Sequence, residues 1–326
     1  MAGAIWVIGE TAADGLARIS GEVATIGRAL AAAAGQELVG LVAGSGIDAA
    51  ASALATFVPR VIAIEIPTAA RTTSVAAVAP TIAALAERDE PAWILVGASP
   101  DGRDLAGTLA ALLDRGVLVN ASSIAWNATD GPVVESSVFG GRLVVSSAFS
   151  GDRGIVTVRP NSVVAEPAAT AGVIEPVAIA PTVALPAVTV LERVAATAAV
   201  ASIDEASIVV AGGRGVGGPD GFRVVEDLAA ALGGVVGATR AAVDAGWIPY
   251  SRQIGQTGKI VKPKLYLALG VSGAIQHKVG MQTAGTIVAV NRDPDAPIAE
   301  FADMVVIGDL FEIAPAIASE LRSRTG

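Results

Sequence analysis

The sequence predicts an α/β protein with two domains. The N-terminal domain is expected to have a parallel sheet with added hairpin strands, and the C-terminal domain a doubly wound sheet. The chain has 326 residues, more than one minimal domain needs. Apolar residues make up 52% and charged residues 16%, so a large core can form. Short apolar runs alternate with helical patterns, and this alternation begins twice, near residues 5 and 207.

The first alternating set predicts a sheet covered by helices on both faces. Its strands are continuous apolar runs, which is typical of parallel strands buried on both sides. The expected strands are Ile5–Ile8, Leu38–Val42, Val61–Ile66 and Trp93–Val96. The expected helices are Leu16–Ala34, Ala49–Phe57, Ser74–Arg88 and Leu105–Arg115.

After Leu118 the pattern changes to short, partly alternating runs separated by glycine-rich turns, which predicts hairpin strands. These strands are Val133–Phe139, Arg142–Phe149 and Gly154–Arg159. Residues 160–201 are then rich in Pro, Ala and Val. We expect the domain boundary near the end of this segment, which gives domains at 1–197 and 198–326.

The second alternating set predicts the doubly wound domain. The expected strands are Ser207–Ala211, Val235–Gly237, Leu265–Leu269, Ile287–Val290 and Met304–Ile307. The expected helices are Gly221–Leu232, Ala274–Met281 and Leu310–Arg322.

Composition excludes several classes of function. A net charge of -9 and few aromatic residues argue against a nucleic-acid partner. The chain has no cysteine and only one histidine, His277, so disulfides, thiolate chemistry and multi-histidine metal sites are excluded. We expect no metal and no catalytic acid, base or nucleophile. The sequence also shows no signal peptide and no transmembrane segment, which predicts a cytoplasmic protein.

A glycine-rich loop follows the first strand of the second domain. Gly213, Gly215 and Gly218 satisfy the spacing GxGxxG, and Arg214 adds a cation. Such a loop lets backbone amides approach a phosphate. The alternatives are a structural tight turn or an NAD-binding loop. The NAD interpretation lacks a ribose-binding acid, because residues 235–239 contain none.

Five further polar or glycine-rich loops lie at strand ends of this domain: Thr239-Arg240, Gln253–Lys259, Gly270–His277, Asn291–Pro297 and Gly308–Leu310. Ser272 is expected as an N-cap or a phosphate ligand. Asp309 is either the N-cap of the last helix or a carboxylate that faces an adenosine. Because the carboxyl ends of parallel strands meet at one edge, the loops together predict a long, phosphorylated ligand such as a dinucleotide.

These residues resemble the FAD-binding domain of the electron-transfer flavoprotein alpha subunit, over roughly residues 205–315. The N-terminal domain is similar only in architecture and size. The segments that carry the resemblance are GGRG at 212–215, TRAAVDAGW at 239–247, GQTGK at 255–259, LGVSGAIQH at 269–277, AVNRDPDAPI at 289–298 and GDLFEI at 308–313.

The resemblance implies a Rossmann-like FAD-binding domain in an electron carrier that performs no substrate chemistry of its own. It implies a heterodimer with a beta subunit, which itself holds AMP or a second FAD. It also implies acyl-CoA or other dehydrogenases as electron donors, as in fatty acid beta-oxidation, and a quinone oxidoreductase or another acceptor.

The resemblance further implies which residues contact FAD. They are Arg214, Thr239, Arg240, Ile254, Gly255, Gln256, Thr257, Ser272, Gly273, Ala274, Ile275, Gln276, His277, Asn291 and Asp309. By similarity, Arg240, Thr257 and His277 lie near the isoalloxazine ring. Two other functions stay open at this point. One is an NAD-linked dehydrogenase that uses the loop Gly213–Gly218, and the other is a non-redox adenine-nucleotide-binding protein that uses the N-terminal domain.

Overall fold

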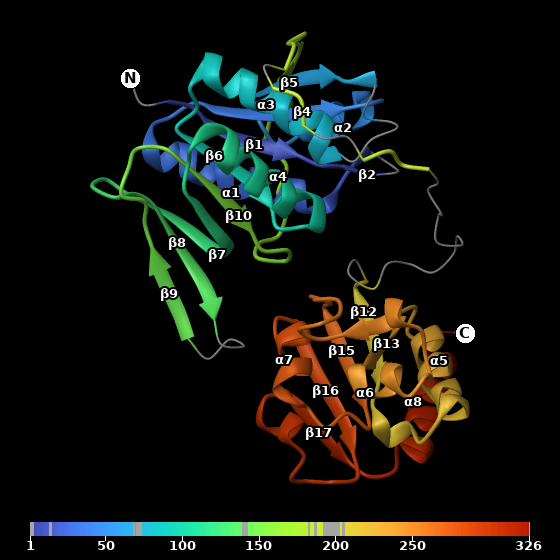
Figure 1. The fold of residues 1–326 in the computed structure, drawn as a ribbon. Coiled ribbons are helices and arrows are strands. Elements are labelled where there is room, and N and C mark those ends of the chain that lie inside the picture. The colour runs from blue at the N-terminus through green and yellow to red at the C-terminus, as the bar shows by residue number, and fades with distance from the viewer. Residues whose placement is uncertain are drawn as a thin grey trace. The chain divides into compact units, whose positions relative to one another are not determined.

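The chain folds into two compact units, Met1–Val194 and Ala195–Gly326 (Figure 1). The computed structural model describes residues 3–12, 15–67, 69, 74–138, 143–181, 183–185, 188–191, 203 and 206–325. Both units are layered α/β folds, which confirms the predicted fold class. The boundary expected at residue 197 lies outside the described residues, as do Phe139 and Arg142 at the ends of two predicted hairpin strands.

The N-terminal unit is built on one large sheet with nine strands among the described residues. The strands lie in the order β11-β5-β4-β1-β6-β10-β7-β8-β9. Neighbours are parallel from β11 to β7, whereas β7/β8 and β8/β9 pair antiparallel. The strands are β1 Ile5–Gly9, β4 Leu38–Gly44, β5 Arg60–Glu65, β6 Trp93–Gly97, β7 Val117–Asn127, β8 Gly131–Val138, β9 Leu143–Ser147, β10 Gly154–Val158 and β11 Val173–Pro176. A small ribbon of β2 (Thr11–Ala12) and β3 (Gly15–Leu16) follows β1.

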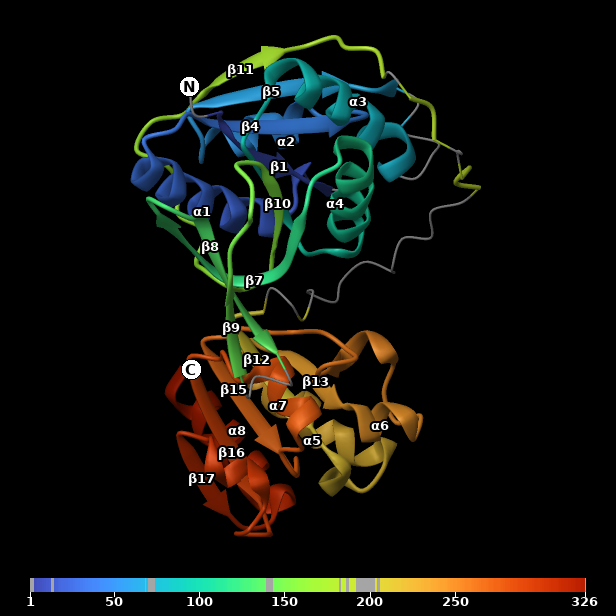
Figure 2. The same cartoon turned by 60° about the vertical axis from the view of Figure 1, so that its left-hand side comes forward.

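Helices cover both faces of this sheet because successive residues of its buried strands point to opposite sides. Val7 on β1 belongs to the core beneath α1 (Arg18–Ala34) and α2 (Asp48–Ala55). Its neighbour Trp6 belongs to the core beneath α3 (Ser74–Asp89) and α4 (Pro100–Leu113). In Figure 2, α1 and α4 lie on opposite sides of the sheet.

The prediction of a third hairpin strand at Gly154–Arg159 is wrong. Strand β10 instead lies inside the sheet, parallel to both β6 and β7. All five of its residues are buried. A continuous buried run is the pattern of a parallel strand, and the Gly-Asp-Arg segment before it is a connection back to the middle of the sheet.

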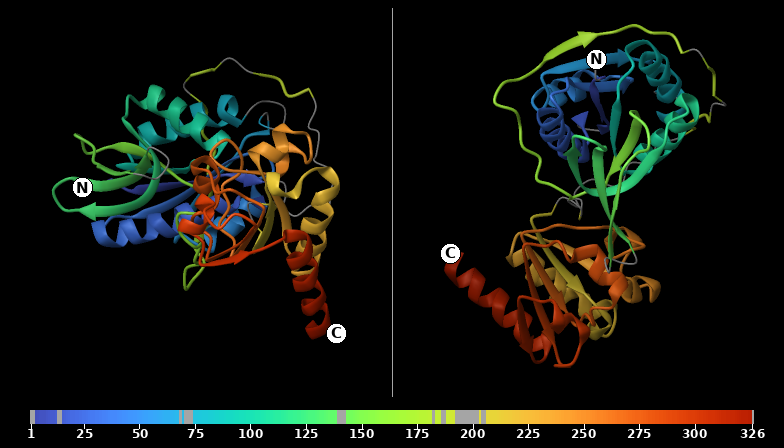
Figure 3. Two further views of the ribbon diagram at one scale, coloured as in Figure 1. Left: turned by 90° about the horizontal axis from the view of Figure 1, so that it is seen from below. Right: turned by 90° about the vertical axis from the view of Figure 1, so that its left-hand side faces the viewer.

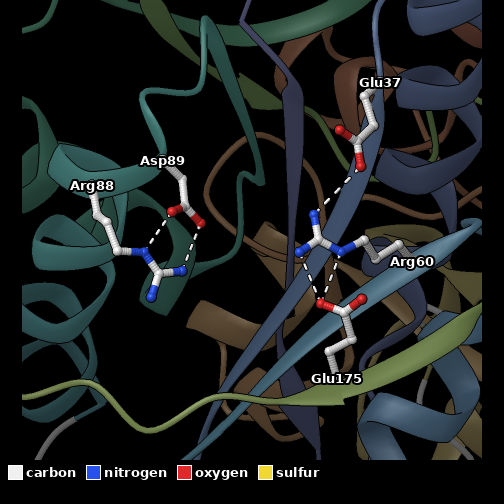
Figure 4. Close-up of polar contacts among 5 residues, drawn as sticks. All are labelled: Glu37, Arg60, Arg88, Asp89 and Glu175. Atoms are coloured by element: carbon white, nitrogen blue, oxygen red, sulfur yellow. Dashed lines mark hydrogen bonds and ion pairs between the residues drawn. The ribbon is translucent and has the colours of Figure 1, made fainter.

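Besides the short β2 and β3, two strands of the large sheet were not predicted. Strand β7 carries alternating exposed positions, and β11 lies in the Pro/Ala/Val-rich segment. Figure 4 shows how β11 is tied to β5. The Arg60 guanidinium donates to one oxygen of Glu175 on β11 from Nε and Nη2, at 3.0 and 2.8 Å, and it donates to Glu37 at 3.4 Å. Arg60 therefore joins the edge strand to the sheet.

The C-terminal unit has a six-stranded sheet among the described residues, in the order β14-β13-β12-β15-β16-β17, and all neighbours are parallel. The strands are β12 Ile208–Gly212, β13 Val235–Thr239, β14 Gln253–Ile254, β15 Leu265–Leu269, β16 Thr286–Asn291 and β17 Met304–Ile307. The order of strands reverses between β12 and β15. In parallel sheets of this kind, ligands usually bind in the crevice beyond the carboxyl ends of the two strands between which the order reverses.

Helices also cover both faces of the second sheet. Helices α5 (Phe222–Ala231), α6 (Arg240–Asp244) and α8 (Leu310–Thr325) pack on one face. Helix α7 (Ile275–Met281) packs on the other. Helix α8, red in Figure 3, leads to the C-terminal end of the chain. No helix in the described part of the chain is both long and apolar enough to cross a membrane.

Candidate functional site

A cavity of about 580 Å³ lies beyond the carboxyl ends of β12, β13, β15 and β16. It is lined by the loops that the sequence indicated after these strands. Twelve of the fifteen expected FAD-contact residues line it: Arg214, Thr239, Arg240, Ile254, Gly255, Gln256, Thr257, Ser272, Ala274, Gln276, His277 and Asn291. The fold therefore gathers residues that are up to 77 positions apart in sequence, the separation of Arg214 and Asn291, around one space.

The glycine-rich loop after β12 lies directly against the loop after β15. The amides of Gly213 and Gly215 donate to Leu269 O at 2.9 Å and to Gly270 O at 3.0 Å. A Cβ on Gly213 would lie 2.3 Å from Gly270 O, so no larger residue fits there. These two glycines join the central strands, and their amides are not free to bind a phosphate.

The cavity also carries cationic side chains. Arg214 is exposed, and its guanidinium has no ion-pair or hydrogen-bond partner among the described residues. Arg240 is exposed as well, but its Nε lies 3.1 Å from Asp244 Oδ2 one helical turn away. Arg214 is thus the guanidinium best able to bind an anionic group, because it breaks no existing ion pair to do so.

Thr239 presents a buried hydroxyl whose hydrogen-bonding capacity is unused. It is the N-cap residue of α6, but its side chain makes no capping hydrogen bond, and Oγ1 has no partner in the part of the chain that the structure describes. A buried hydroxyl without a partner costs roughly 1–3 kcal/mol. Because Thr239 lines the cavity, a polar ligand group at this point would remove that cost. The residues present therefore fit a hydroxylated or phosphorylated cofactor.

The single histidine lies at the cavity but is held by the protein. His277 is 6% exposed. Its Nδ1 lies 3.1 Å from Ile254 O, and its Nε2 lies 2.7 Å from the hydroxyl of Tyr266, which is fully buried. A carbonyl only accepts, so Nδ1 carries the proton and Nε2 accepts from Tyr266. Burial lowers the pKa of His277 to about 4, so the ring is neutral near pH 7.

This geometry determines what the imidazole of His277 can donate. A neutral imidazole has one N–H group, and here that group is donated to Ile254 O. His277 thereby fastens the segment at Ile254 to α7 and β15. Its placement next to the cavity agrees with the sequence-based expectation, but in this arrangement it has no proton left to donate to a ligand.

Asn291 shapes the cavity through both atoms of its amide. Its Nδ2 donates to Val271 O at 2.9 Å, and its Oδ1 accepts from the amide of Asp293 at 3.1 Å. The side chain thus links the loop after β16 to the loop after β15. Such a residue positions the walls of a site even where it does not touch the ligand.

Three expected contact residues do not line the cavity. Gly273 has φ of 84°, and a Cβ there would lie 2.4 Å from the amide nitrogen of Ile298, so it serves close backbone packing. Ile275 is 44% exposed at the start of α7. Asp309 Oδ1 accepts from the Phe311 amide at 2.9 Å, and Oδ2 binds Arg292, so Asp309 is the N-cap of α8.

Other details of the site also differ from expectation. The N-cap of α7 is Ala274, so the N-cap role considered for Ser272 is wrong. Several lining residues were not among the expected contacts. Six of them lie in the predicted loops, namely Gly215, Gly270, Val271, Asp293, Ala296 and Pro297, and two lie outside these loops, Ala241 and Asp244. Asp244 carried a usable signal, because it lies four residues after Arg240 in a helix.

The described residues contain no group of three or more His, Asp or Glu side chains that could hold a metal ion.

Comparisons with known proteins agree with this geometry. Residues 202–282 match the family model described as the electron transfer flavoprotein FAD-binding domain. Residues 5–184 match the electron transfer flavoprotein domain, so similarity extends to the N-terminal unit, where the sequence showed only a likeness of architecture.

Curated relatives cover most of the chain. A protein of Mycobacterium leprae named electron transfer flavoprotein subunit alpha is 48% identical over 75% of this chain and 76% of its own length. Proteins with the same name from Clostridium acetobutylicum and Bacillus subtilis are each 34% identical. They cover 98% and 97% of this chain, and 97% and 96% of their own lengths.

Proposed function

The chain belongs to the electron transfer flavoprotein alpha subunit family, and from this premise we propose that FAD binds in the cavity beyond β12 and β15. The FAD-binding domain of the family makes FAD the cofactor. The observation that carries the proposed location is the unpartnered hydroxyl of Thr239, in the wall that also presents the free guanidinium of Arg214. FAD brings the hydroxyl, phosphate and ring groups that such a wall can bind.

We propose that the chain works as an electron carrier. Bound FAD supplies the capacity to take up and release electrons. The residues of the cavity bind and orient it: Arg214 by charge, Thr239 and Thr257 by hydroxyl groups, and His277 by fixing the wall at Ile254. We propose acyl-CoA or other dehydrogenases as electron donors and a quinone oxidoreductase or another protein as acceptor.

Membership of the family implies a beta subunit as partner. The exposed apolar side chains of the N-terminal unit support this inference, since Leu143, Val144 and Val145 on β9 are 55%, 62% and 44% exposed. Large exposed apolar side chains gathered on one element are typical of a protein–protein contact. The residues of the beta subunit itself determine whether that subunit holds AMP or a second FAD.

The two other functions gain no specific support. An NAD-binding loop would present amides to a pyrophosphate. Here the amides of Gly213 and Gly215 are donated to the chain itself. In the N-terminal domain, the usual nucleotide site would be the crevice beyond the carboxyl ends of β1 and β6, where the strand order reverses. The cavity at this point measures only about 60 Å³, and the two larger cavities of this unit, about 670 and 660 Å³, lie elsewhere, beside Glu90 and Arg153. A drug-sized ligand needs several times the volume of the cavity in the crevice.

The visible absorption spectrum tests the proposal. The full chain, produced together with its beta subunit, should be yellow and should release FAD on denaturation. Thr239→Val should lower the FAD content after dialysis, whereas Thr108→Val, at a half-buried threonine of α4, should leave it unchanged. A colourless complex that does not take up added FAD would contradict the proposed function.

A further inference from the structure

The loop from Gln253 to Lys259 holds Thr257 by its backbone and by its side chain. The Gln253 Nε2 group donates to Thr257 Oγ1 at 3.1 Å, and the Tyr250 hydroxyl donates to Thr257 O at 2.6 Å. The loop is closed further by the amide of Lys259, which donates to Gln253 O at 2.7 Å. Gln253 is 2% exposed, so its amide group is enclosed by protein.

These contacts determine which way the hydroxyl of Thr257 donates. An amide NH₂ group can only donate, so Thr257 Oγ1 is the acceptor in its bond with Gln253. A hydroxyl has one proton, and among the described residues nothing accepts it. Thr257 lines the cavity, whereas Gln253 lies behind it and does not. The proton of Thr257 is therefore available to an acceptor in the cavity.

We propose that Gln253 is a positioning residue, which fixes the hydroxyl of Thr257 as a hydrogen-bond donor toward the flavin ring and thereby raises the reduction potential of bound FAD. This inference rests on the proposed function, since it takes FAD as the ligand and Thr257 as a neighbour of its ring. Gln253 acts only through Thr257.

The direction of the effect follows from charge. Reduction adds negative charge to the ring, and a hydrogen bond to a more negative acceptor is stronger. A donor fixed toward the ring therefore stabilises the reduced cofactor more than the oxidised one. Without the Gln253 amide the hydroxyl of Thr257 can turn away, and the reduced cofactor loses part of this stabilisation.

The test replaces the amide and measures the potential. Gln253→Met keeps a similar length and removes the donor. We expect the two-electron midpoint potential of the FAD complex to fall by up to ~30 mV, which corresponds to a change of about tenfold in the redox equilibrium. Gln282→Met, the same change at a residue of this domain that does not line the cavity, serves as the control and should leave the potential unchanged.

A second pair of variants shows whether Gln253 acts through Thr257. In a Thr257→Val background, Gln253→Met should shift the potential no further, because no hydroxyl remains to be oriented. If Gln253→Met fails to fold, Gln253→Glu offers the same length with a carboxylate that accepts the hydroxyl proton and turns it from the cavity. This variant should lower the potential more with Thr257 present than in the Thr257→Val background, because the negative charge of the carboxylate lowers it in both.

The outcomes separate this inference from the proposed function. A Gln253→Met complex that keeps its FAD but has the potential of the parent protein would overturn the inference and leave the FAD site intact. An equal shift with and without the Thr257 hydroxyl would also overturn it. A parent complex that binds no FAD would instead contradict the proposed function.

Discussion

At the scale of single residues, His277 shows how burial decides the chemistry of a site. Its pKa of about 4, against an ordinary value of 6.5, is caused chiefly by burial. The unfolded chain therefore takes up a proton below pH 6.5, and the folded chain does not until about pH 4. The free energy of unfolding should fall as the pH drops through this window, by about 2 kcal/mol between pH 7.5 and pH 5.

The ring can be followed individually in a complex in which only this chain is isotope-labelled, because the chain has only one histidine. We expect the imidazole carbon and nitrogen resonances of His277 to stay those of a neutral ring with the proton on Nδ1 down to pH 5. Urea unfolding should show the loss of stability between pH 7.5 and pH 5, and His277→Gln should remove this contribution. A ring that titrates near pH 6.5 would show that His277 is not enclosed by Tyr266 and Ile254.

Arg214 carries a second prediction at this scale. It is exposed in the cavity wall and has no ion-pair partner among the described residues. A charge-assisted contact with a phosphate is worth roughly 1.5–3 kcal/mol, so Arg214→Ala should raise the dissociation constant of FAD by ~10–100-fold. Arg223→Ala is the matched control, since Arg223 pairs with Asp220 and does not line the cavity. Equal FAD retention by both variants after dialysis would leave Arg214 without a role in binding.

The sequence located the loops of the site but not the hydrogen bonds within it. Loops such as Thr239-Arg240 could be assigned to one crevice because the carboxyl ends of parallel strands meet at one edge. The partners of His277 could not be predicted, since Tyr266 and Ile254 are 11 and 23 residues away in sequence. They lie on the strands β15 and β14, whereas His277 lies on helix α7. Only the folded chain shows that the ring has no free N–H group.

At the scale of elements, the sequence predicted where most strands lie better than how they pair. The five apolar residues of β1 and of β6 are buried as expected. Strand β10 was assigned to a hairpin because glycine-rich turns flank it, although its residues are as continuously buried as those of β1. The burial of a short strand is decided by its neighbours β6 and β7, and these lie far away in sequence.

Strand β11 carries a prediction about local stability. It has four residues, it pairs with β5 alone among the described strands, and the ion pair between Arg60 and Glu175 adds a side-chain link (Figure 4). Glu175→Gln should therefore speed hydrogen exchange of the amides of Val173 and Val177, which donate to Pro59 O and Ala63 O. Amides of the central strands should exchange as before.

The same link should depend on pH. The Arg60 guanidinium lowers the pKa of Glu175 in the folded chain. The stability that this ion pair contributes is therefore present above pH 4.5, the ordinary pKa of a glutamate side chain. It is lost as the pH falls through the lower pKa that Glu175 has in the folded chain. The variant Arg60→Met removes the ion pair with Glu175. Its control is Arg88→Met, which breaks an exposed pair with Asp89 at the end of α3. If both variants leave exchange at β11 unchanged, backbone pairing alone holds the strand.

At the scale of the whole molecule, the N-terminal unit has an apolar surface that its own core does not cover. Leu143 and Val145 point to one side of β9 and Val144 to the other, and all three are exposed. Strand β9 is also the edge of the sheet, with a row of backbone groups left unpaired. In Figure 1, β8 and β9 extend beyond the helices that cover the sheet. A ribbon that is apolar on both sides is expected to be covered by a partner, and the family implies a beta subunit.

We therefore predict that the chain is stable and retains flavin only as a heterodimer. Produced alone, it should aggregate or lose FAD during size-exclusion chromatography, and together with the beta subunit it should elute as a 1:1 complex. Val144→Glu places a charge in the apolar ribbon and should weaken this complex by roughly 2 kcal/mol or more, about 30-fold in the dissociation constant. Val164→Glu, at a valine that is 70% exposed elsewhere in the same unit, controls for the added charge and should leave the complex intact. A fully flavin-loaded monomer would contradict the obligate partner, and equal association by both variants would show that the partner does not cover β9.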